Sequence, residues 1–142
     1  MNTRYTPLVK LKKSTMDKSE RVVQQANADL NSASMALQIS YNSLDDIDMP
    51  NTGTMSAMLA SRSLLTSQRS LIQNNQEWVS FAKNQVFQAK ENLKKDMIEF
   101  EKFKYLELQE IKEQIKKQKI QDAKDLDEVA LMTFSNNEKR NK

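Results

Sequence analysis

Large apolar side chains recur at every seventh position through most of this chain, in two separate runs. The first run is Val9, Met16, Val23, Leu30, Leu37 and Leu44, and the second is Met58, Leu65, Ile72, Val79, Val86, Leu93 and Phe100. Positions three residues further on are mostly small or polar, as at Ala26, Ala33 and Ser40. Sevenfold spacing is typical of helices that wind around a partner with a left-handed supercoil. The sequence therefore predicts an all-α fold with two long helices.

The two runs are separated by the only glycine of the chain, Gly53, which lies shortly after Pro50. Pro50 disfavours helix at the preceding residue, and Gly53 readily adopts φ > 0. We therefore expect one turn, with Thr54 as the N-cap of the following helix and Thr6 as the cap before Pro7 at the start of the first. The prediction is a single antiparallel coiled-coil hairpin with a helix at about 7–48, a turn at about 49–54, a longer helix at about 54–134 and a disordered tail at 135–142.

A turn near residue 50 also predicts how the two helices pair. Val9 should lie opposite the region of Leu93, and the second helix beyond about residue 100 should have no partner within the chain. That part still carries large apolar side chains from Phe103 to Phe134. An exposed apolar stripe of this length predicts a partner, either another protein or a second copy of the chain that pairs through residues 101–134.

Composition argues against an active site. The chain has no Cys and no His, which removes thiolate ligands, the commonest general base and the commonest transition-metal ligand. One glycine cannot make a glycine-rich phosphate loop, and neighbouring carboxylates such as Asp45 and Asp46 point in different directions on a helix. We therefore expect no enzyme, no cofactor and no bound metal. The chain shows neither a signal peptide nor a membrane-spanning apolar run, so we expect a cytoplasmic protein.

Charge is distributed unevenly along the chain, whose net charge is +3. Basic residues gather toward both ends, so a hairpin would bring the termini together at a basic end. Lys112, Lys116 and Lys117 alternate with acidic residues, which is typical of a helix surface with i,i+4 ion pairs. The alternative is an electrostatic docking face for an acidic protein pore or a lipid surface. Aromatic side chains do not alternate with these lysines, so we expect no nucleic-acid partner.

Several aromatic residues lie close to the heptad positions without occupying them. Trp78, Phe81 and Phe87 would either pack at the flank of the coiled coil or stay exposed as anchors for a binding partner. Tyr41, next to the predicted turn, is open to the same two interpretations. The sequence does not decide between them.

The carboxyl-terminal part of the chain resembles the FliJ family of flagellar export proteins. The resemblance lies in the charged stretch at 102–107 and in residues 119–131, which contain a Leu-Asp-Glu-hydrophobic-Ala element at 126–130. It implies a non-enzymatic component of the flagellar type III export apparatus that is similar to the central stalk of rotary ATPases. Expected partners are the export ATPase ring and the membrane-embedded export gate, together with substrate chaperones, and any association with the membrane would run through these partners.

The resemblance and the charge distribution together define two candidate surfaces. At the terminal end, the residues expected to contact the ATPase ring are Lys10, Lys12, Lys13, Arg21, Lys112, Lys116, Lys117, Asp125, Leu126, Asp127, Glu128, Val129 and Ala130. At the turn end, the residues expected to contact the export gate are Leu37, Tyr41, Leu44, Leu65 and Arg69. The competing hypothesis is a structural coiled coil that self-associates through residues 101–134.

Overall fold

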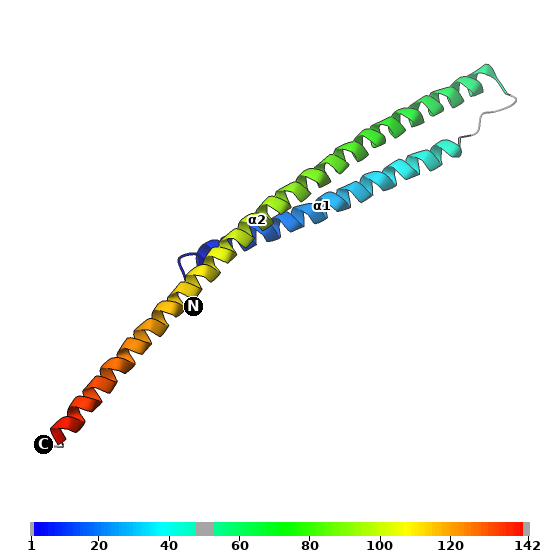
Figure 1. Cartoon of the computed structure of the whole chain (residues 1–142). Coiled ribbons are helices and arrows are strands. Elements are labelled where there is room, and N and C mark those ends of the chain that lie inside the picture. Colours follow the sequence, from blue (N-terminus) through cyan, green and yellow to red (C-terminus); the bar gives the residue numbers. More distant parts are fainter. Residues whose placement is uncertain (1, 48–52, 141–142) are drawn as a thin grey trace. The chain divides into compact units, whose positions relative to one another are not determined.

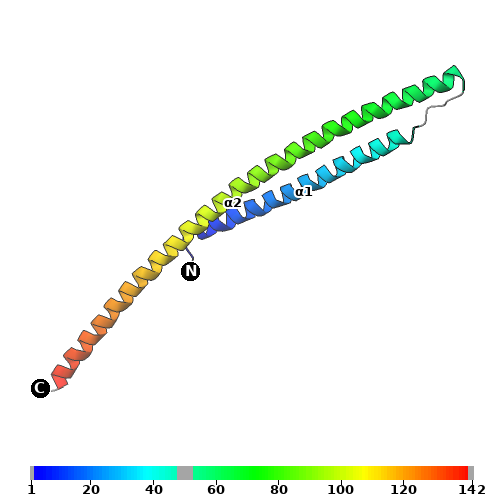
Figure 2. The same cartoon turned by 45° about the vertical axis from the view of Figure 1, so that its right-hand side comes forward.

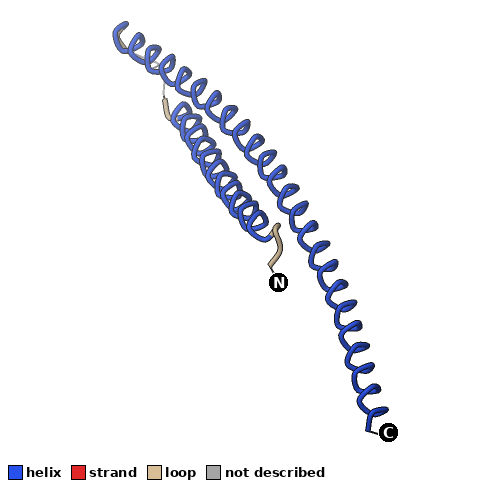
Figure 3. Tube along the Cα trace, turned by 90° about the vertical axis from the view of Figure 1, so that its left-hand side faces the viewer, coloured by secondary structure: helices blue, strands red, loops and turns tan. Residues whose placement is uncertain are grey.

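The protein consists of two α-helices in the computed structural model, which describes residues 2–47 and 53–140. Helix α1 spans Thr6–Asp45 and helix α2 spans Met55–Arg140. Helix accounts for 94% of the described residues, and Figure 3 shows no strand among them. The predicted all-α hairpin with a longer second helix is confirmed.

The chain forms two compact units, and both helices contribute to each. The first unit comprises residues 1–13 and 98–142, and the second comprises residues 14–97. Within the second unit, α1 and α2 lie side by side and run antiparallel in both views (Figures 1 and 2). The first turns of α2 reach beyond the end of α1 there, and residues 55–60 are all exposed.

The heptad positions form the contact between the helices of the second unit, as predicted. Ala26, Val86 and Ala89 make a small buried cluster, against which Val23 and Leu30 pack. The other buried side chains among the described residues of this unit are those of Ala33, Ser40, Ile72 and Ala82. Small residues let the helix axes approach closely while the larger ones fill the space beside them. Met58 also occupies a heptad position but is 44% exposed, because it lies in the first turns of α2, near the end of α1.

The pairing register differs from the predicted one. In the second unit, Ser19 hydrogen-bonds Asp96 and Ser40 hydrogen-bonds Asn75, whereas the expected register would have paired these serines with residues near 82 and 61. In the first unit, Lys12 contacts Phe103 rather than the region near residue 89. The prediction that Val9 faces Leu93 is therefore wrong. The reason is that α1 ends at Asp45 and the first turns of α2 have no partner, so pairing starts later along α2.

The helix ends also differ in detail from the expectation. Thr54 caps α2 as predicted, because its hydroxyl accepts a hydrogen bond from the Ala57 N–H at 3.3 Å. Gly53, just before it, has φ +157°, a conformation that L side chains rarely adopt. Helix α1 already includes Thr6, and α2 continues through Arg140 where a disordered tail was expected. Lys139 and Arg140 favour this continuation by their charge at the helix carboxyl end. The predicted turn residues 49–52 lie outside the described residues.

Candidate interaction surfaces

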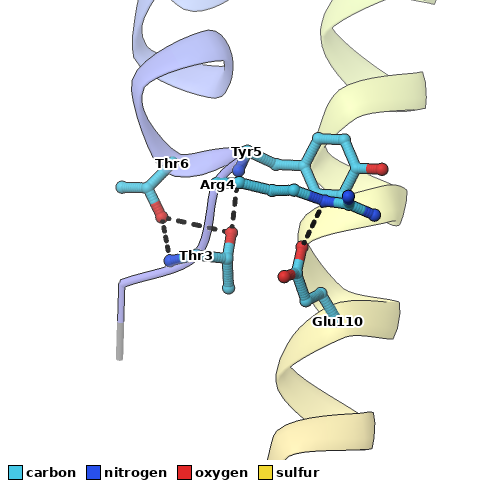
Figure 4. Close-up of polar contacts among 5 residues, drawn as sticks. All are labelled: Thr3, Arg4, Tyr5, Thr6 and Glu110. Carbon is cyan, nitrogen blue, oxygen red and sulfur yellow. Dashed lines mark hydrogen bonds and ion pairs between the residues drawn. The ribbon is translucent and has the colours of Figure 1, made fainter.

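The amino-terminal residues of the first unit are tied together by threonine hydroxyls, as Figure 4 shows. The Thr6 hydroxyl accepts a hydrogen bond from the Thr3 N–H at 2.9 Å, and the Thr3 hydroxyl accepts one from the Tyr5 N–H at 3.1 Å. These bonds satisfy N–H groups that have no partner within the helix. Thr3 is buried, so residues 3–6 form a fixed cap on α1.

The same cap contacts α2 within the first unit through a charged group and an aromatic ring. Nε of Arg4 lies 3.4 Å from Oε2 of Glu110 (Figure 4). The Tyr5 ring packs against the Phe103 ring with 6.5 Å between centroids. Lys12 places its ammonium 5.5 Å from the Phe103 centroid and 3.6 Å from Oε2 of Glu99. We name Arg4, Tyr5, Lys12, Phe103 and Glu110 the terminal clasp.

The terminal clasp corrects the prediction that α2 lacks a partner within the chain beyond about residue 100. Half-buried residues continue along α2 as far as Gln114. From Ile115 to Arg140, in contrast, every residue of α2 is exposed. The part of α2 without an α1 partner is therefore 115–140, whereas seven of the fourteen residues from 101 to 114 are half-buried within the first unit.

Large apolar side chains remain exposed along this part of α2. Leu126 is 69% exposed and Val129 is 58% exposed. Both line a shallow hollow on the helix surface together with Asp122 and Asp125. The others are Ile115, Ile120, Leu131, Met132 and Phe134. We name residues 115–140 the free segment of α2.

The residues expected at the ATPase-binding end are placed as follows. Lys12 is half-buried in the terminal clasp, and Lys10 and Lys13 of the first unit are exposed on α1. Lys112 is exposed just before the free segment. The free segment itself carries Lys116, Lys117, Asp125, Leu126, Asp127, Glu128, Val129 and Ala130, all exposed. Arg21 is exposed on α1 in the second unit. The structure thus brings Lys12 into the terminal clasp, and Lys117 lines a hollow together with Arg4, Tyr5 and Glu110.

The residues expected at the gate-binding end fall into two groups. Leu37, Leu44 and Leu65 are half-buried at heptad positions between the helices, whereas Tyr41 and Arg69 are exposed. The hydroxyl oxygen of Tyr41 accepts a hydrogen bond from the Gln76 amide nitrogen. Of the five, Tyr41 and Arg69 have exposed side chains, while the three leucines lie in the contact between the helices.

The aromatic side chains that the sequence left open are exposed in the second unit. Trp78 is 43%, Phe81 62% and Phe87 63% exposed. Phe81 lines a hollow between the helices together with Val22, Ala26 and Ala89, and amide side chains such as Gln25 and Gln85 surround it. All three side chains are thus partly accessible at the surface of the second unit, and Phe81 also packs at the flank of the helix contact.

A polar layer interrupts the apolar contact between the helices of the second unit. Ser40 is 2% exposed, and its hydroxyl accepts a hydrogen bond from the Asn75 amide. Asn75 also donates to the carbonyl oxygen of Ala36 at 3.3 Å, and Gln68 donates to the carbonyl oxygen of Ser40 at 2.9 Å. Buried polar groups of this kind favour one register because any other would leave them without partners.

Sequence reasoning missed the terminal clasp and this polar layer. A Thr-x-x-Thr spacing at residues 3–6 resembles a capping box and could have indicated the cap. The polar layer had a weaker signal, since Ser40 and Asn75 sit at heptad positions but their pairing depends on the register. No group of side chains suited to hold a metal ion occurs within the described residues. Neither helix, as far as it is described, has a stretch long and apolar enough to cross a bilayer.

Comparison with known protein families gives a match over almost the whole chain. The sequence model of the FliJ family, described as flagellar FliJ protein, matches residues 1–139. Neither a curated protein nor a solved structure matches the chain significantly. The match covers both units and includes α1, the terminal clasp and nearly all of the free segment.

Proposed function

Because the chain belongs to the FliJ family of flagellar proteins, and is thus a coiled-coil protein of flagellar export, we propose that it acts as a non-enzymatic adaptor of the export machinery. In this proposal it binds the export ATPase ring at one surface and the membrane-embedded export gate at another. Escort of substrate chaperones is a further part of the proposal. The protein would act in the cytoplasm and reach the inner face of the membrane only through these partners.

The free segment of α2 is the observation that carries the ATPase-binding part of the proposal. It presents Leu126 and Val129 to solvent, with Lys116 and Lys117 exposed on the same segment. An amphipathic helix with an unpaired apolar face can insert into a groove of a partner protein, and cations beside it can steer the approach to an acidic surface. The terminal clasp supports this arrangement by holding the adjoining residues of α2 against α1 in the first unit.

The ATPase-binding part is tested with the full chain and the purified export ATPase. We expect the full chain to bind the ATPase and to raise its rate of hydrolysis. The double variant Leu126→Ala and Val129→Ala should bind about tenfold more weakly, because a loss of about 0.7 kcal/mol from each truncated side chain adds up to about 1.4 kcal/mol. The matched control changes two exposed apolar residues of the second unit, Met35→Ala and Leu59→Ala, and should bind normally.

A failure of either kind counts against this part. If the full chain neither binds nor stimulates the ATPase, the proposed function is wrong. If both double variants lose binding equally, the free segment is not the contact surface.

The gate-binding part is supported by the exposed side chains Tyr41 and Arg69 in the second unit. The variant Tyr41→Ala with Arg69→Ala should weaken capture of the full chain by the cytoplasmic part of the gate protein and leave ATPase binding intact. Loss of both interactions at once would indicate a general folding defect, which the far-ultraviolet circular dichroism of the variant would reveal.

The alternative is a structural coiled coil whose free segments pair with each other. The exposed apolar residues between Ile115 and Phe134 favour it. Sedimentation equilibrium separates the two hypotheses. A stable dimer that dissociates in the Leu126→Ala and Val129→Ala variant supports self-association, whereas a monomer that binds the ATPase supports the adaptor.

A further inference from the structure

One flank of the second unit carries a row of cations along α2. Arg62, Arg69, Lys83 and Lys90 are spaced at multiples of seven residues and are all exposed. They occupy the heptad position that directly follows the small residues of the helix contact. At ~1.5 Å per residue the row extends over about 40 Å of α2, with neighbouring positions about 10 Å apart. We name these four residues the cation row.

The facing edge of α1 offers no counter-charge to Lys83 and Lys90. Gln76, which occupies the same heptad position within the row, hydrogen-bonds Tyr41 across the helix contact, so the edge of α1 that contains Tyr41 is the facing one. At seven-residue intervals before Tyr41 that edge carries Ser34 and Asn27, both exposed. Because the helices are antiparallel, these two residues lie opposite Lys83 and Lys90, and neither is a carboxylate. None of the four cations in the row forms an ion pair with any of the described residues.

The opposite flank of α2 differs sharply in charge. There the corresponding positions, at every seventh residue from 57 to 92, hold no charged side chain and include Leu64, Leu71 and Trp78. The cations of this part of α2 are thus collected on one side. Flanking positions of a coiled coil are those that select a partner helix by charge, so the asymmetry indicates a partner on the cationic side.

An exposed ring lies beside the cation row. Phe87 is 63% exposed, with Lys83 four residues before it and Lys90 three residues after it, so the three side chains are neighbours on the helix surface. An aromatic ring between two cations provides an apolar anchor within a basic surface. A partner must therefore supply both carboxylates and an apolar side chain.

The spacing of the row distinguishes among classes of anionic partner. Duplex DNA carries one charge per ~1.7 Å, far denser than one cation per 10 Å or more. Anionic membranes recruit clusters of about four to eight adjacent basic residues, and these four are dispersed. Acidic residues at every seventh position of a helix, in contrast, lie about 10 Å apart and match the row along its length.

We propose that the cation row and Phe87 form a docking surface for an acidic amphipathic helix of another protein. The helix lies along the flank of α2, its carboxylates pair with Arg62, Arg69, Lys83 and Lys90, and one apolar side chain covers Phe87. Arg69 also belongs to the proposed gate-binding residues, but this surface depends on neither the ATPase nor the gate. Its test uses neither protein, so failure here and failure of the proposed function are distinguishable.

The test measures binding of the full chain to a synthetic helix with Glu at every seventh position and Leu beside one of them. A second peptide replaces each Glu by Lys. We expect the acidic peptide to bind and the basic one not to bind, and the affinity for the acidic peptide to fall as salt is added. The fourfold variant Arg62→Glu, Arg69→Glu, Lys83→Glu and Lys90→Glu should bind at least about tenfold more weakly, and Phe87→Ala should also bind more weakly.

A matched control separates the row from net charge. The variant Lys18→Glu, Lys95→Glu, Lys139→Glu and Arg140→Glu makes the same change in net charge at four other exposed positions, and its affinity should change less than about threefold. Circular dichroism of both fourfold variants checks that the helices remain.

The proposal is wrong if the unaltered chain does not bind the acidic peptide, or if both fourfold variants lose affinity for it equally. It is also wrong if the Phe87→Ala variant binds the acidic peptide with full affinity. Tighter binding of the chain to anionic phosphatidylserine vesicles or to duplex DNA than to the acidic peptide would overturn it as well. This last result would assign the row to a lipid surface or a nucleic acid.

Discussion

The polar layer of the second unit can be tested by the substitution Asn75→Ala. The Asn75 amide donates to the Ser40 hydroxyl and to the carbonyl oxygen of Ala36, and the substitution removes both hydrogen bonds between the helices. The Ser40 hydroxyl keeps its own bond to the Ala36 carbonyl at 2.8 Å, so no donor is left without a partner. The loss in the free energy of unfolding is therefore close to the net contribution of two hydrogen bonds.

A hydrogen bond contributes about 0.5–1.5 kcal/mol net to stability, so the two together contribute about 1–3 kcal/mol. Alanine has the higher helix propensity, which offsets up to about 0.7 kcal/mol of this loss. The matched control is Asn74→Ala, because the adjacent residue Asn74 is exposed. This variant gains the same helix propensity and loses neither hydrogen bond. The free energy of unfolding of Asn75→Ala should therefore lie about 1–3 kcal/mol below that of Asn74→Ala.

The measurement is urea unfolding of the full chain followed by circular dichroism at the helix band. The slope of the free energy against urea should stay the same in both variants, because the surface exposed on unfolding does not change. Equal stability of the two variants would refute the assigned register, since Asn75 would then not face Ser40. A greater stability of Asn75→Ala would refute it as well.

Three further predictions concern other parts of the fold. Ala33→Leu should lower the free energy of unfolding by about 1–3 kcal/mol, because Ala33 is 0% exposed between the helices and leaves no room for a larger side chain; an unchanged melting temperature would contradict the close approach of the helices. Thr54→Ala should speed hydrogen exchange at the Ala57 N–H, because the substitution removes the hydroxyl that caps it. The melting temperature should change little because residues 55–60 are exposed. A large drop in melting temperature would show that this end of α2 is packed. Lys12→Ala should lower the free energy of unfolding by no more than about 1.5 kcal/mol, since the ion pair of Lys12 with Glu99 is partly exposed and its contact with Phe103 is of modest strength. Hydrogen exchange at the Val9 N–H should be faster in this variant. An exchange rate equal to that of the unaltered chain would show that Lys12 does not hold the terminal clasp.

The candidate surfaces were predictable only in part. Charge and apolar patterns pointed to the end of α2, and Leu126 and Val129 are indeed exposed there. The exposure of Trp78, Phe81 and Phe87 could not be derived, because a flank position is compatible with packing or with solvent. Leu37, Leu44 and Leu65 were expected at a binding surface although they occupy the main heptad positions, and the structure uses them to join the helices.

Sequence by itself determined the helices, their relative length and the residues that join them. Sevenfold spacing allows only one face of each helix to be apolar, so Ala26, Ala33, Ile72 and Val86 had to meet a partner wherever the helices paired. The spacing is periodic, however, and every shift by seven residues satisfies it almost equally well.

Only the tertiary structure decided which of these registers is used. The buried Ser40 hydroxyl accepts a hydrogen bond from Asn75, and this contact favours one pairing because buried polar groups lose free energy without partners. The partly exposed contacts of Lys12 with Phe103 and Glu99 add a smaller preference for the same pairing. The register in turn determines how far α1 and the terminal clasp cover α2. It is the reason that the free segment begins at Ile115 rather than near residue 100.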